Sequence, residues 1–201
     1  MEEKYTLRDL FVYTITGLCL PLSLFLIEPK KYSAWIINNK DFIKDNGIIV
    51  LVIGIPALYL LGHLIQAVDI LRLEIGTRMF KKAVLRNCAM AKFFYLLLLG
   101  DRLEGVLLLR GEDQSWFWKK VNYNIIQGHY TRSEYWYILK DLCNNLETLC
   151  LCLSFYTFFW TDTSPFWFLG LSIIFWVKSR TYTKTFIRSV EDMNWSLNNS
   201  K

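Results

Sequence analysis

The run from Ile48 to Val68, "IIVLVIGIPALYLLGHLIQAV", limits the possible folds more than any other part of the sequence. As a helix it would be about 31 Å long, enough to cross the ~30 Å hydrocarbon core of a bilayer. Hydrophobic residues make up 53% of the 201-residue chain, which is more than an ordinary small soluble domain contains. We therefore expect a membrane protein, and the scarcity of alternating β patterns favours an all-α fold.

Three further apolar runs predict additional spans. The first, Leu10–Ile27, follows a segment of mixed charge and precedes no small-residue cleavage pattern, so we expect a retained helix kinked at Pro21 rather than a signal peptide. The runs "LCLCLSFYTFFW" and "FWFLGLSIIFWV" predict a helical hairpin with a break from Asp162 to Pro165 and with Trp160 and Trp167 at an interface. Each of these runs is short for a span, so the alternative is two spans plus a peripheral hairpin.

The expected fold class is all-α: a polytopic membrane protein with four transmembrane helices and a helical cytoplasmic insertion between spans two and three. Placing both termini and the insertion on one side collects 19 of the 23 Lys and Arg residues there, and basic residues favour the cytoplasmic side. Both termini are therefore expected in the cytoplasm, with the protein in the inner (cytoplasmic) membrane. The expected domains are an N-terminal transmembrane pair, a cytoplasmic helical region, a C-terminal transmembrane hairpin and a cytoplasmic tail: 1–69 (spans 10–27 and 48–68), 70–141, 142–182 and 183–201.

The cytoplasmic insertion is expected to contain several helices. Four apolar residues recur there at helical spacing: Met79, Phe80, Val84 and Cys88. The segment "RLEGVLLL" predicts a second helix or an elbow, and Ser133 is expected to cap a helix that starts at Glu134 and runs into the third span. The apolar stretch from Phe93 to Leu99 is either the core of this region or a helix lying on the inner leaflet.

Six polar side chains lie within or beside the expected spans and are the pore or gate candidates: His63, Gln66, Asp69, Asn144, Asn145 and Glu147. The first three share one helical face, which should point at protein or water because uncompensated polar groups are costly in hydrocarbon. That face either forms interhelical hydrogen bonds, with Asp69 paired to Arg72, or lines an ion or water path. Glu147 likewise either pairs with a cation (Arg72, Lys178 or Arg180) or lines a gate.

Eight cations are candidates for binding lipid headgroups or an anionic ligand: Lys81, Lys82, Lys119, Lys120, Lys178, Arg180, Lys184 and Arg188. Those that follow span four are typical of a collar that binds headgroups. Aromatic residues in "SWFWKKVNYN" and "HYTRSEYWY" are also of the kind that stack on bases beside phosphate-binding cations. A packed aromatic core would contain the same residue types.

The sequence offers no pattern for catalysis or metal binding. It contains no Gly-rich phosphate loop, no GxSxG and no HExxH, and neither His63 nor His129 has the arginine spacing of HEPN ribonucleases. The five cysteines lack zinc-site spacing and are expected to be free thiols in a reducing compartment. We expect no enzyme activity, no cofactor and no metal site.

Four segments together resemble a known group of proteins: "LRDLFVYTITGLCLPL", "ALYLLGHLIQAVDIL", "SEYWYILKDLCNNLETLCLCL" and "FIRSVED". The pattern is similar to small four-span prokaryotic membrane proteins of antiviral defence loci, namely the Hailong-type membrane effector and the four-span accessory protein of type VI-B CRISPR systems. The match is best at Gly62–His63 and around Asn145 and Glu147.

Hailong-type membership implies a homo-oligomeric channel, closed until a nucleotide or oligonucleotide signal opens it and depolarises the cell. Membership of the CRISPR accessory group implies a membrane-anchored regulator or adaptor of an RNA-guided RNase, with a defence-system protein as partner. A channel would need several protomers in the bilayer, and Gly54 and Gly62 are expected to allow their close approach.

Overall fold

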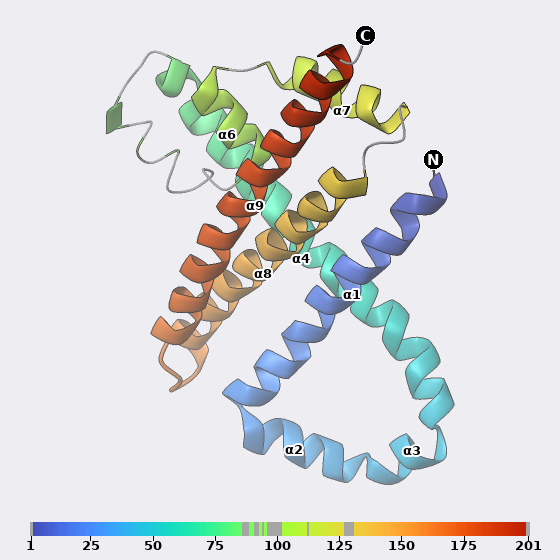
Figure 1. Ribbon diagram of the computed structural model, residues 1–201. Helices are drawn as coiled ribbons and strands as arrows, with labels where there is room; N and C mark the ends of the chain where they lie inside the picture. Colours follow the sequence, from blue (N-terminus) through green and yellow to red (C-terminus); the bar gives the residue numbers. More distant parts are fainter. Residues whose placement is uncertain are drawn as a thin grey trace. The chain divides into compact units, whose positions relative to one another are not determined.

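The computed structural model describes residues 2–85, 89–90, 93, 95, 102–111, 113–126 and 131–199. Helices account for nearly all of these ranges, and no strand occurs within them, so the expected all-α class is confirmed. The helices are α1 (Glu2–Ile27), α2 (Pro29–Asn38), α3 (Lys40–Asp45), α4 (Gly47–Leu85), α6 (Leu103–Arg110), α7 (Gln114–Ile126), α8 (Thr131–Trp160) and α9 (Phe166–Asn199) (Figure 1).

Two helices in the described part of the chain are long and apolar enough to cross a membrane, through Leu10–Ile27 of α1 and Gly47–Met79 of α4. The first has the bounds expected from sequence. The second belongs to a helix of 39 residues, about 58 Å long and nearly twice the thickness of the hydrocarbon core. The helix therefore continues well past Val68, where the sequence placed the end of the span.

Contacts between residues divide the chain into two units. Unit 1 comprises Met1–Asp69 and Asn145–Ile174, and unit 2 comprises Ile70–Asn144 and Phe175–Lys201. Helices α4, α8 and α9 each contribute one part to each unit.

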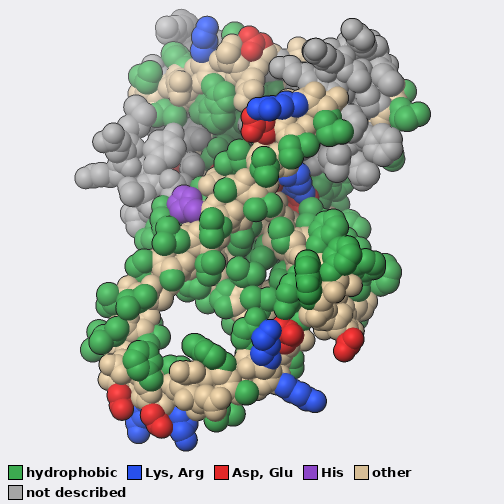
Figure 2. Space-filling model, turned by 180° about the vertical axis from the view of Figure 1, so that it is seen from behind, with side chains coloured by type: hydrophobic (Ala, Val, Ile, Leu, Met, Phe, Trp, Pro, Cys, Tyr) green, Lys and Arg blue, Asp and Glu red, His purple; other side chains and the backbone are tan. Residues whose placement is uncertain are grey.

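Unit 1 buries polar side chains and exposes apolar ones. Its buried polar residues are Thr16, Asp69, Asn145, Glu147, Thr148, Ser154, Thr157 and Ser172. Its apolar core is small, built around Ile27, Leu149 and Leu153, whereas consecutive residues of α4 such as Leu51, Val52 and Ile53 are 64–66% exposed. Figure 2 shows hydrophobic side chains over the surface of α1 and α4 and charged side chains along the α2–α3 segment. This distribution is the reverse of that in a soluble protein.

The backbones of α1 and α4 touch at two glycines. A Cβ atom on Gly17 would lie 1.8 Å from the carbonyl oxygen of Leu58, and one on Gly62 would lie 2.0 Å from that of Tyr13. Gly62 thus allows a close contact between α1 and α4 of the same chain, and the approach between protomers stays a prediction. Nothing lies within 4 Å of the corresponding position on Gly54.

Unit 2 has a conventional apolar core made by three helices. The buried residues are Leu103, Val106 and Leu107 of α6, Phe117 and Val121 of α7, and Phe186, Ile187 and Val190 of α9. Asn124 Nδ2 of α7 donates a hydrogen bond of 3.3 Å to the carbonyl oxygen of Val190. Asp113 caps α7, because its Oδ1 accepts a 2.9 Å hydrogen bond from the backbone N–H of Ser115.

Three details bear on the expected helix ends. The chain breaks between Trp160, the last residue of α8, and Phe166, the first of α9, as the sequence predicted. The expected cap at Ser133 is wrong: α8 already begins at Thr131, and the Oγ of Ser133 is buried and accepts a 3.1 Å hydrogen bond from Ser189 Oγ. Helices α2 and α3, between the first two expected spans, were not anticipated.

Part of the central segment lies outside the described residues. Of the stretch from Phe93 to Leu99, only Phe93, which is exposed, and Tyr95, which is buried, are described. Cys88 and His129 also lie outside the described ranges.

Candidate functional site

The interior of unit 1 holds three of the six polar candidates. Thr148 Oγ1 of α8 donates a 2.7 Å hydrogen bond to Asp69 Oδ1 of α4, and both residues are buried. Glu147 and Asn145, on the same part of α8, are 3% and 2% exposed. Asp69, Asn145 and Glu147 therefore lie in the protein interior, as expected for polar groups that must avoid hydrocarbon.

The side-chain amide of Asn145 carries a donor that no described residue satisfies. Its Nδ2 is buried and has no hydrogen-bond partner among the described residues. An unsatisfied buried donor costs about 1–3 kcal/mol, and buried polar groups in proteins are nearly always satisfied by protein or by ordered water. The interior around Asn145 is therefore a place where water or a polar ligand would be stabilised.

His63 is packed against two tyrosine rings. Its ring centroid lies 3.9 Å from that of Tyr13 on α1 and 4.5 Å from that of Tyr59 on α4. Gln66 is partly exposed. The three polar residues of α4 thus meet different surroundings, since His63 contacts α1 whereas Asp69 contacts α8.

Asn144 belongs to unit 2, in contrast to its neighbour Asn145. Ser179 Oγ of α9 donates a hydrogen bond to Asn144 Oδ1, and both side chains are buried. This bond joins α8 to α9 within unit 2, and the pore or gate role of Asn144 stays a prediction.

Six of the eight candidate cations have described side chains, all in unit 2. Lys120 Nζ of α7 lies 3.4 Å from the centroid of the Trp116 ring, and the guanidinium of Arg180 on α9 lies 5.6 Å from that of Trp176. The other four are exposed: Lys119 on α7 and Lys178, Lys184 and Arg188 on α9. Lys81 and Lys82 are part of α4, but their side chains lie outside the described ones.

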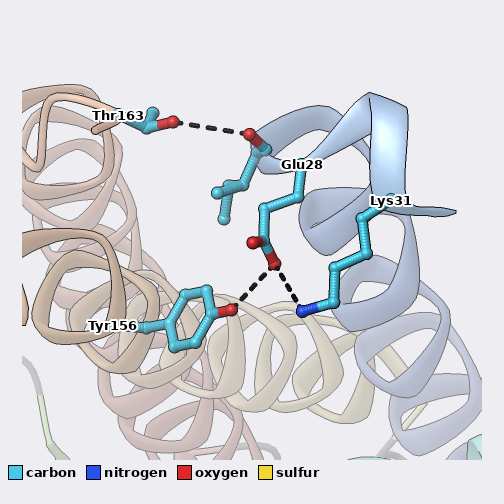
Figure 3. Close-up of polar contacts among 5 residues, drawn as sticks. Glu28, Lys31, Tyr156 and Thr163 are labelled. Atoms are coloured by element: carbon cyan, nitrogen blue, oxygen red, sulfur yellow. Dashed lines mark hydrogen bonds and ion pairs between the residues drawn. The ribbon is translucent and has the colours of Figure 1, made fainter. Parts of the chain in front are cut away.

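A polar cluster that sequence reasoning missed joins the end of α1 to α8 and the loop after it. Glu28 Oε2 accepts hydrogen bonds from Tyr156 Oη (2.9 Å) and Lys31 Nζ (3.2 Å), and Thr163 Oγ1 donates to the carbonyl oxygen of Ile27 at 3.5 Å (Figure 3). The hydrogen bond from Tyr156 and then the one from Lys31 hold the pKa of Glu28 below its usual value, and Glu28 in turn raises the pKa of Lys31.

The pKa shift of Glu28 makes a prediction about pH. Because its folded-state pKa lies below the usual 4.5, the stabilisation is fully present above that pH and is lost as pH falls through the folded-state value. The substitution Glu28→Gln should therefore lower the thermal midpoint at pH 7, with the difference from wild type closing below roughly pH 4. Circular dichroism melts in detergent from pH 3 to 7 measure this, and a pH-independent difference would contradict it.

Comparison with known proteins found no match: no family model, no curated protein and no solved structure matches this chain.

Among the described residues, no group of three or more His, Cys, Asp and Glu side chains could hold a metal ion.

Sequence reasoning missed three residues of the site: Thr148, Tyr156 and Glu28. Thr148 bonds a residue 79 positions away in the sequence, and Tyr156 and Glu28, which bond each other, are 128 positions apart. The sequence could have revealed only the pair of Glu28 and Lys31, because these two residues are three positions apart just after an apolar run.

Proposed function

We propose that this chain is a four-span membrane protein that assembles into a homo-oligomeric, ligand-gated pore and serves as a membrane effector of prokaryotic antiviral defence. The observation that carries the membrane part is the reversed polarity of unit 1. Only 11% of the apolar window of α4 is buried, whereas a core helix of a soluble protein of this length would be mostly buried. Hydrocarbon is the medium that suits such a surface.

The composition of unit 1 supports four spans. It groups the first candidate span and the part of the second up to Asp69 with residues 145–160 of α8 and 166–174 of α9, the apolar parts of the expected hairpin. Aromatic side chains on these parts are 63–77% exposed, as lipid-facing ones would be: Phe155, Phe158, Phe159, Trp160, Phe166 and Trp167. The proposed location is the inner membrane, with both termini in the cytoplasm.

The polar interior supports the pore. Asp69, Glu147 and the unsatisfied amide of Asn145 are buried in unit 1, where ionisable groups usually mark ion or water pathways. One protomer with four helices has little room for a channel, so we propose that several protomers complete it. The cations of α7 and α9 would receive a nucleotide or oligonucleotide signal, since phosphates favour clustered Lys and Arg near aromatic rings.

Conduction should depend on the buried carboxylates. Asp69→Asn and Glu147→Gln keep the side-chain size but remove the charge, and each should lower ion flux through activated protein in liposomes about tenfold, a change in barrier of ~1.4 kcal/mol. The matched control is Glu74→Gln, because Glu74 of α4 is exposed and paired with Arg78. Equal flux in all three variants, with assembly intact by gel filtration, would remove Asp69 and Glu147 from the pathway.

One observation favours a second function, a membrane-anchored regulator or adaptor of an RNA-guided RNase. Unit 2 has its own apolar core, as a protein-binding domain would. This function predicts that a soluble partner binds through unit 2 while the conductance of liposomes stays at background with and without nucleotides.

A further inference from the structure

A groove lies where the chain turns from α1 into α2. Its volume is about 300 Å³. From α1 it is lined by Leu18, Pro21, Leu22 and Phe25, and from α2 by Tyr32, Trp35 and Ile36. The lining is almost wholly apolar, and the groove is open on one side.

Helix α2 is not held in place by burial in protein. None of its residues is buried, and Trp35, Ile36 and Ile37 are 61%, 45% and 62% exposed. A helix of ten residues is marginal by itself in water, so an apolar medium is needed to cover these side chains. The position of its first turn is fixed by a hydrogen bond from Tyr156 of α8 to Glu28, the residue before the helix.

We propose that the groove binds one acyl chain of a bilayer phospholipid. This inference rests on the proposed function, in which Leu10–Ile27 crosses the bilayer. The groove is then continuous with the lipid-facing surface of α1, since its residues Leu18 and Leu22 and the neighbouring Leu26 are all exposed. Its volume accommodates about ten groups the size of a water molecule (~30 Å³ each), which suits a segment of a hydrocarbon chain.

The residues beside the groove suit the polar end of the same lipid. Tyr32 and Trp35 are the aromatic types that gather at membrane interfaces. Lys30 and Lys31 occupy the first turn of α2, and both are exposed although Lys31 is also paired with Glu28. Such side chains can keep their stems in the apolar layer while the ammonium group meets a phosphate. Figure 2 shows open space between α1, the α2–α3 segment and α4, so a chain can enter from the bilayer.

A second copy of the protein is a poorer occupant. A stable protein interface buries about 800 Å² and roughly 20–30 residues on each partner, whereas seven residues line the groove. The groove has the size of a single hydrocarbon chain. Its apolar lining, the aromatic residues beside it and the nearby lysines suit the acyl chain, the interface and the phosphate of a phospholipid.

Photocrosslinking tests this assignment. The full protein in detergent is given a near-equimolar amount of phosphatidylglycerol that carries a diazirine near the end of one acyl chain, and the crosslinked peptides are mapped by mass spectrometry. We expect crosslinks to concentrate in residues 18–36. Leu22→Trp and Ile36→Trp fill the groove from its two sides and should lower that crosslinking about tenfold. Leu26→Trp, on the exposed surface beside the groove, should not.

The outcomes distinguish failure of the lipid site from failure of the proposed membrane function. Crosslinks spread evenly over exposed apolar residues such as Leu51–Ile53, or unaffected by both groove-filling variants, would overturn the lipid site and indicate annular lipid only. Crosslinks lost in the groove-filling variants together with a fall in the number of protomers in the assembly would overturn it in favour of a second copy. Washing membranes with alkaline carbonate tests the spanning itself: extraction of the protein defeats the proposed function, whereas retention without groove crosslinks defeats only the lipid site.

Discussion

Replacing Gly62 by alanine is expected to break the packing of α1 on α4. The new methyl group would lie 2.0 Å from the carbonyl oxygen of Tyr13, and backbone atoms cannot move aside as the end of a flexible side chain can. Forcing the helices apart should cost about 3 kcal/mol or more, which corresponds to a fall in the thermal midpoint of roughly 6–12 °C. Gly17→Ala should have a similar effect, because its methyl group would lie 1.8 Å from the carbonyl oxygen of Leu58.

The same helix contains the control for this experiment. Gly54 also lies in α4, but nothing is within 4 Å of the position that its Cβ would take. Gly54→Ala should therefore leave the midpoint unchanged or raise it, because alanine is favoured over glycine in a helix by about 1 kcal/mol. Melts followed by circular dichroism in one detergent compare the three variants. Equal midpoints for Gly54→Ala and Gly62→Ala would show that the two helices do not approach so closely.

Local patterns in the sequence predict much of the secondary structure. Composition predicts the apolar run of Leu10–Ile27 and the break between Trp160 and Phe166. It did not predict that α4 continues past Val68, where the apolar run ends. Helix α2 was missed although Pro29 occupies its first turn, a position that proline favours and that could have revealed it.

Tertiary partners could not be predicted in the same way. Helical periodicity shows that Asp69 must face protein or water, but it does not show that Thr148 is the donor that meets it. Gly62 is visibly a small residue in an apolar helix, yet only the fold shows that Tyr13 of the same chain fills the space beside it. Ser133 is a residue type that often caps helices, but here its buried hydroxyl accepts a hydrogen bond from Ser189 instead.

Removing the Phe186 side chain is expected to unfold unit 2. The ring is fully buried in α9 and lies 5.8 Å from that of Phe117 and 5.2 Å from that of Tyr137, measured between centroids. Phe186→Ala should cost about 3–5 kcal/mol through lost burial and the cavity left behind. Phe159→Ala is the control, since the side chain of Phe159 in unit 1 is 63% exposed and should meet lipid or detergent in either state.

Hydrogen exchange measured by mass spectrometry in detergent locates the damage. We expect Phe186→Ala to lose protection in residues 103–126 and 175–193 and to keep it in 10–27 and 48–69, because the two units have separate cores. Loss of protection throughout the chain would mean that the units unfold as one.

The same variant distinguishes the two proposed functions. A pore that is gated through unit 2 should still assemble in liposomes when unit 2 is unfolded, but its ion flux should no longer respond to a nucleotide, because the cations of α7 and α9 are held by the core that contains Phe186. An adaptor should lose its soluble partner, with flux at background before and after the substitution. Flux that still responds to nucleotide in Phe186→Ala would place the receiving site outside unit 2.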